Sequence, residues 1–114
     1  MKELNRLERI VYFIDYIINK TENISFQEFI NDEDLLFLSA FSLSQIGEIT
    51  NKIIIENPSI IDEVKEIPWS KIRGMRNRII HDYQNINQKI LWETVTISLP
   101  ELKLLFENHL KRMS

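Results

Sequence analysis

Residues 34–56 read DLLFLSAFSLSQIGEITNKIIIE. Apolar side chains recur every three or four residues along this stretch, a spacing that predicts a helix. They fall on more than one side, as expected for a helix buried between neighbours. Gly47 lies in the middle, where glycine costs up to about 1 kcal/mol relative to alanine. We therefore expect the central helix of a bundle, closely crossed by another helix at Gly47.

The rest of the chain shows the same helical spacing, with only two glycines and three prolines among 114 residues. Pro100 lies within the last expected helix and should kink it or mark a short break. The expected helices cover residues 2–21, 26–30, 34–56, 59–65, 68–80 and 88–111, with a loop over 85–87. The sequence therefore predicts one domain, residues 1–114, with an all-α fold: an antiparallel up-down bundle of four to five helices.

Capping residues support several of these boundaries. Ser25 and Glu28 match a capping box at the start of the second helix. Either Asp32 or Asp34 can cap the central helix. Pro68 suits the first turn of the fifth helix, because its missing N–H would have no partner there.

Composition excludes several classes of function. The chain has no cysteine, which excludes disulfides, zinc–thiolate sites and cysteine nucleophiles. Charges occur throughout the first 20 residues, unlike a signal peptide, and no run of about 18 apolar residues predicts a membrane span. We expect a cytoplasmic protein without membrane contact. Because the net charge is −3, any nucleic-acid role must rest on a local basic patch.

Such a patch occurs in residues 68–83, PWSKIRGMRNRIIHDY. Between Pro68 and His81 there is no acidic residue, and the four cations are Lys71, Arg73, Arg76 and Arg78. This is the one segment where a phosphate backbone would be attracted. The simpler alternative is a helix face that only contacts water.

Four side chains in this segment can cooperate chemically. His81 can accept and donate a proton near neutral pH, and Arg76 presents a fixed fork of donors to a phosphate. Asn77 and His81 share a helix face at i and i+4, with Arg76 at its border and Tyr83 nearby. These groups suit RNA cleavage by acid–base catalysis with a cation on the phosphate. One His and one Arg per chain are few for this, so we expect a symmetric dimer with the site at its interface.

No cofactor is expected, and no metal, because the chain lacks paired acid–histidine motifs and a glycine-rich phosphate loop. Trp69 and Trp92 could stack on bases, but we favour core or dimer-interface positions for both. His109 is expected to be exposed and without a role. The roles of Glu48 and Asp82 stay open: each could serve the site or simply face water.

The pattern Arg76-x4-His81-x-Tyr83 resembles the signature of the HepT-like proteins, a branch of the HEPN ribonuclease superfamily. The surrounding residues agree: Ile67-Pro68-Trp69 before the motif, Gly74-Met75-Arg76-Asn77 leading into it, and Leu99-Pro100 in the last helix. Further agreement comes from the segments LSQIGE, residues 43–48, and WET, residues 92–94. The resemblance covers nearly the whole chain.

This resemblance implies a HEPN-like helical bundle that dimerises, and a ribonuclease toxin of a bacterial or archaeal type VII toxin–antitoxin system. Arg76 and His81 would be catalytic, and Asn77 would help position the phosphate or His81. Arg73, Arg78 and Lys71 would add positive charge for RNA. The partner would be a small nucleotidyltransferase that transfers AMP to Tyr83 and so silences the site. The assembly would be a homodimer, or a larger hetero-oligomer with the antitoxin.

Two other functions are weighed against this one. The chain could be a non-catalytic, substrate-binding or accessory subunit of a nucleotidyltransferase, in which case RNA would stay intact. It could also be a helical interaction module whose basic stretch only contacts water, and then mutating Arg76, His81 or Tyr83 would change nothing.

Overall fold

The computed structural model describes residues 2–82 and 87–113, and of Ile80, His81 and Asp82 it describes the helical backbone alone. Within these ranges the chain is helical and contains no strand, so the expected all-α fold is confirmed. The elements are α1 (Lys2–Thr21), α2 (Phe26–Ile30), α3 (Glu33–Glu56), α4 (Ile60–Glu63), α5 (Trp69–Asp82), α6 (Gln88–Glu93), the π-helical turn η2 (Thr94–Ser98) and α7 (Leu99–Met113).

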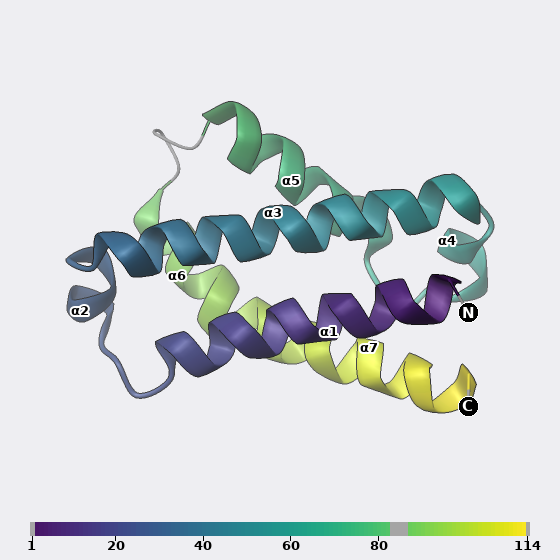
Figure 1. Ribbon diagram of the computed structural model, residues 1–114, viewed down its shortest axis with the longest axis horizontal. Coiled ribbons are helices and arrows are strands. Elements are labelled where there is room, and N and C mark those ends of the chain that lie inside the picture. The colour runs from purple at the N-terminus through teal and green to yellow at the C-terminus, as the bar shows by residue number, and fades with distance from the viewer. Residues whose placement is uncertain (1, 83–86, 114) are drawn as a thin grey trace.

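Helix α3 lies at the centre of the bundle, as its apolar pattern predicts. It packs against α1 on one side and α5 on the other, and α7 covers the far side of α1 (Figure 1). Consecutive long helices run in opposite directions, so the up-down arrangement is also confirmed (Figure 1). None of the described helices is both long and apolar enough to cross a membrane.

The expected caps are present. Ser25 and Glu28 form the reciprocal capping box at the start of α2. Asp32, rather than Asp34, caps α3 by accepting the N–H of Leu35 at 3.1 Å, so α3 begins one residue earlier than expected. Of the expected loop, residues 85 and 86 lie outside the described residues, and Asn87 caps α6.

The last helix is not the single element expected from residue 88 to residue 111. The π-helical turn η2 separates α6 from α7, and the N–H of Leu99 bonds to the carbonyl of Thr94, five residues earlier. Pro100 follows directly. Proline lacks an N–H and its ring clashes with the carbonyl four residues earlier, so a wider turn here relieves both problems. The break expected at Pro100 is therefore confirmed.

Both tryptophans pack inside the bundle, as favoured from the sequence. Trp69 is 1% exposed, donates its Nε1–H to the carbonyl of Val64 at 2.9 Å and meets Phe106 edge to face. Trp92 is half-buried and packs against Phe29, with ring centroids 5.0 Å apart. For His109 the expectation was wrong, because the side chain is half-buried on α7 rather than exposed.

Candidate functional site

Helices α3 and α5 pack closely together at Gly47. A β-carbon on Gly47 would lie 2.6 Å from the β-carbon of Arg76, 2.9 Å from its backbone nitrogen and 3.1 Å from the carbonyl oxygen of Ile72. Real β-carbons do not come this close to other atoms, so a side chain at position 47 would push the helices apart. The close crossing predicted at Gly47 is confirmed, and the residue that it places against α3 is Arg76.

Arg76 is held by a carboxylate from α3. Its Nε lies 2.5 Å from Oε2 of Glu48, and both side chains are about one-third exposed. Nε is buried and its N–H does not point squarely at the oxygen, so the contact is an ion pair rather than an aligned hydrogen bond. Glu48 follows Gly47 directly, and the close crossing therefore brings its carboxylate to Arg76.

Asn77 provides a second contact. Its Oδ1 accepts a hydrogen bond from Nη1 of Arg76 at 3.1 Å, and the Asn77 side chain is exposed. A guanidinium carries five N–H donors. Glu48 engages the Nε side and Asn77 takes one Nη1–H, which leaves three donors on the two terminal nitrogens for a ligand or for side chains beyond the described part of the chain. Two terminal nitrogens suit bidentate contact with a phosphate.

His81 lies in the last turn of α5, one helical turn after Asn77. That separation is about 6 Å along the helix axis. The side chains of His81 and Asp82, and the whole of Tyr83, lie outside the description. The convergence of His81 and Tyr83 with Arg76 therefore stays a prediction, supported by the helical backbone from residue 76 to residue 81.

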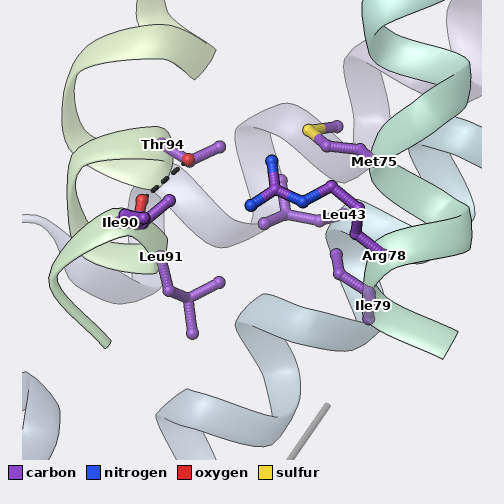
Figure 2. A pocket seen from close by; sticks show the side chains of 7 residues that line it. All are labelled: Leu43, Met75, Arg78, Ile79, Ile90, Leu91 and Thr94. Carbon is purple, nitrogen blue, oxygen red and sulfur yellow. Dashed lines mark hydrogen bonds between the residues drawn. The ribbon is translucent and has the colours of Figure 1, made fainter. Parts of the chain in front are cut away.

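Two other cations of α5, Lys71 and Arg78, line a groove of about 720 Å³ between α5 and the segment α6–η2–α7. Figure 2 shows Arg78 reaching from α5 toward Ile90 and Thr94 of that segment. Arg73 is half-buried, and no ion pair of Lys71, Arg73 or Arg78 is found among the side chains of residues 2–79 and 87–113.

The arrangement thus divides the predicted residues into two groups. Arg76 and Asn77 are in contact, and Glu48 joins them. Lys71 and Arg78 instead border the groove, where their charges can act on a long polyanion.

Comparison with known proteins agrees with this helical bundle. Residues 2–108 match the family described as Ribonuclease HepT-like. The chain belongs to this family. The expected resemblance is confirmed at the level of family and fold.

Relatives come from both bacteria and archaea. The probable ribonuclease HepT of Thermococcus cleftensis is 34% identical over 102 residues, which cover 89% of each chain. A provisionally named RNase of Caldanaerobacter subterraneus is 34% identical over 97 residues, covering 85% of this chain and 84% of the relative. One from Methanocaldococcus jannaschii is 34% identical over 102 residues, covering 90% and 82%. This HepT-like chain is thus matched over nearly the full length of each relative.

Glu48 is the site residue that sequence reasoning left open. A signal for it was present, because Glu48 follows the glycine at which a close crossing was expected. The missing information was which residue of the crossing helix meets Gly47, and periodicity cannot give the register between two helices. The structure gives that register, with Arg76 opposite Gly47.

Proposed function

We propose that this HepT-like chain is a metal-independent ribonuclease and the toxin of a type VII toxin–antitoxin pair, acting in the cytoplasm. The observation that carries the proposal is the anchored guanidinium of Arg76, which has donors left over and lies one to two turns before His81 on the same helix. Membership of a ribonuclease family and the cation-rich surface of α5 support it.

In the proposed reaction, His81 removes the proton from a ribose 2′-hydroxyl. The freed oxygen attacks the adjacent phosphorus, and Arg76 stabilises the negative charge that develops on the phosphoryl oxygens. The bond to the 5′-oxygen then breaks, and that oxygen takes a proton from an acid. Lys71, Arg73 and Arg78 attract the rest of the RNA backbone, and Asn77 orients the Arg76 fork.

A single chain offers one His81 and one Arg76, whereas this scheme uses a base and an acid. A homodimer with the two motifs side by side supplies a second histidine as the acid. The functional unit proposed is therefore a homodimer, alone or within a larger hetero-oligomer that includes the nucleotidyltransferase antitoxin.

Replacing His81 with alanine tests the proposal. We expect RNA cleavage to fall at least about 100-fold, because a general acid–base contributes about 10²–10⁴ in rate. Cleavage by the unaltered chain should be the same in excess chelator. The measurement is the initial rate on a labelled single-stranded RNA, with circular dichroism to show that the variant folds.

The chain supplies its own control for this experiment. Its second histidine, His109, is half-buried on α7, and His109→Ala should cleave at the rate of the unaltered protein. Full cleavage by folded His81→Ala would contradict the proposed role. If the unaltered chain leaves RNA intact while a nucleotidyltransferase depends on it for activity, the chain is an accessory subunit instead.

We further propose that the antitoxin transfers AMP from ATP to the hydroxyl of Tyr83, with pyrophosphate as the leaving group. An anionic adduct two residues after His81 would compete with RNA phosphates for Arg76 and block access to the site.

Coexpression with the nucleotidyltransferase is expected to raise the intact mass of the chain by whole AMP units. The adduct should disappear in Tyr83→Phe and persist in Tyr12→Phe, since Tyr12 lies on α1, an element that does not carry the motif. Tyr83→Phe should also stay toxic in the presence of the antitoxin. An adduct that survives Tyr83→Phe would place the modification elsewhere.

A further inference from the structure

Glu48 contacts Arg76, the arginine proposed to bind phosphate, although it lies outside the pattern Arg76-x4-His81-x-Tyr83. Its Oε2 lies 2.5 Å from Nε of Arg76, so the two opposite charges are in direct contact. The pair is two-thirds buried on each side, so water only partly screens it. An interaction of this kind restricts where the guanidinium can go.

The backbones on either side of the pair are fixed as well. With no side chain on Gly47, α3 and α5 pack closer at Arg76 than a β-carbon on Gly47 would allow. The backbones of Glu48 and Arg76 therefore belong to two closely packed helices. Only the side chains between them have freedom, and the ion pair removes much of it.

The contact also selects which edge of Arg76 is presented. Glu48 occupies the Nε side and Asn77 takes one hydrogen of Nη1. The two terminal nitrogens keep three N–H donors that no described side chain takes up. An arginine without this anchor would sample many rotamers, and its fork would meet a phosphate in only some of them.

We infer that Glu48 is a positioning residue, which holds the Arg76 guanidinium so that its terminal edge meets the scissile phosphate. This inference rests on the proposed ribonuclease function. A carboxylate this close to a phosphate repels it, so Glu48 weakens RNA binding while it aligns the group that acts on the transition state. Removing Glu48 should therefore lower kcat without raising KM, and this pattern separates a positioning role from a structural one.

The test measures kcat and KM for RNA cleavage by Glu48→Ala and Glu48→Gln. In Glu48→Ala, kcat is expected to fall about 10- to 100-fold, because misplacement by about 1 Å can cost 100-fold. KM should stay the same or fall, because a negative charge has been removed. In Glu48→Gln the amide oxygen can still contact Arg76, and kcat should be recovered in part.

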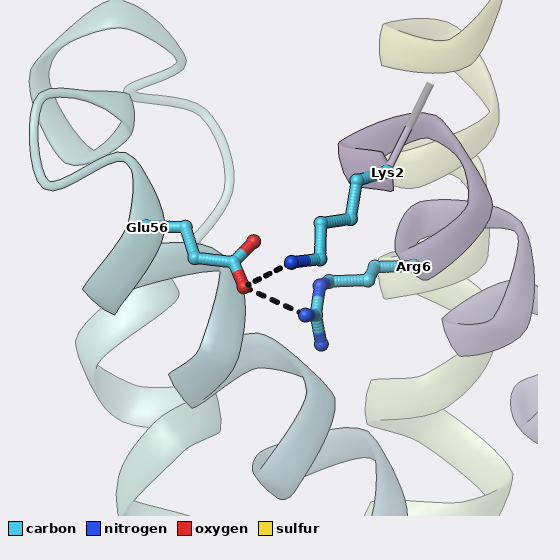
Figure 3. Close-up of polar contacts among 3 residues, drawn as sticks. All are labelled: Lys2, Arg6 and Glu56. Carbon is cyan, nitrogen blue, oxygen red and sulfur yellow. Dashed lines mark hydrogen bonds and ion pairs between the residues drawn. The ribbon is translucent and has the colours of Figure 1, made fainter.

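A matched control lies eight residues further along α3. Oε1 of Glu56 forms ion pairs with two residues of α1: it lies 2.7 Å from Nη2 of Arg6 and 3.5 Å from Nζ of Lys2 (Figure 3). Its side chain is 39% exposed, close to the 33% of Glu48. Glu56→Ala removes the same type of charge from the same helix, far from Arg76. It should keep kcat within about twofold of the unaltered protein, since it contacts no group of the proposed site.

A separate measurement does not need turnover. A double-mutant cycle compares the thermal unfolding of the unaltered chain with that of Glu48→Ala, Arg76→Ala and the double variant. If the two residues interact, the changes in Tm of the single variants do not add up to that of the double variant. Additive changes, or an unaltered kcat in both Glu48 variants of a chain that does cleave RNA, would overturn the inference. A rise in KM with kcat unchanged would also overturn it. Absence of cleavage by the unaltered chain would instead reject the proposed function, with the cycle still testing the pair.

Discussion

Replacing Gly47 with alanine is expected to destabilise the fold and to suppress activity together. The new methyl group would lie 2.6 Å from the β-carbon of Arg76 and 2.9 Å from its backbone nitrogen, so α5 must move away from α3. Forcing an extra carbon into a packed contact costs about 1–3 kcal/mol. The same movement carries Arg76 away from Glu48, and RNA cleavage should fall about 10- to 100-fold.

The second glycine of the chain provides the control. A β-carbon on Gly74 would meet no atom within 4 Å among the described residues, and its backbone does not have a positive φ. Gly74→Ala should therefore stabilise α5 by up to about 1 kcal/mol. Urea unfolding at one fixed protein concentration measures both changes. A Gly47→Ala variant as stable and as active as Gly74→Ala would show that the crossing is not tight.

Trp69→Ala is expected to have the largest effect on stability. Trp69 is 1% exposed and packs edge to face on Phe106 with ring centroids 5.8 Å apart. Removing a buried aromatic side chain costs about 3–5 kcal/mol. The change also removes the N–H that the carbonyl of Val64 accepts at 2.9 Å, and an unpaired buried carbonyl costs about 1–3 kcal/mol. Urea unfolding should show a variant that is marginally folded or unfolded at room temperature.

Two further variants separate these contributions. Trp69→Phe keeps a large ring but lacks the N–H donor, so the decrease in its free energy of unfolding should lie between zero and that of Trp69→Ala. Trp92→Ala removes a half-buried ring, and its free energy of unfolding should fall clearly less than that of Trp69→Ala. Equal losses for Trp69→Ala and Trp92→Ala would mean that burial does not decide the contribution of these side chains.

Most of the fold could be predicted from local patterns. The caps at Ser25 and Asp32 and the apolar spacing of α1 and α3 are properties of short segments, and each was expected within about a turn. The division of the last helix was only partly foreseen. Pro100 signals a break, but the choice of a π-helical turn depends on how α6 and α7 both pack onto the bundle, which is a tertiary effect.

For the site, the sequence identified residue types but could not supply the relation between helices. Arg76 and Asn77 were expected together because they are adjacent in sequence, and they are in contact. Lys71 and Arg78 were grouped with them by charge alone, whereas helix rotation places them along the groove. Glu48 lies 28 residues before Arg76, and only the register set by Gly47 brings the two side chains together.

The π-helical turn before Pro100 also limits how this chain can vary in length. A π turn amounts to an α-helix with one inserted residue. Deleting a residue between 94 and 98 would restore a regular α-helix, because the π turn absorbs the extra residue locally. Leu102 and Phe106, which are 8% and 0% exposed, would keep their places in the core. The deletion would instead return Pro100 to a regular α-helical turn, where its ring clashes with the carbonyl four residues earlier. Loss of the inserted residue should therefore be tolerated only together with replacement of Pro100.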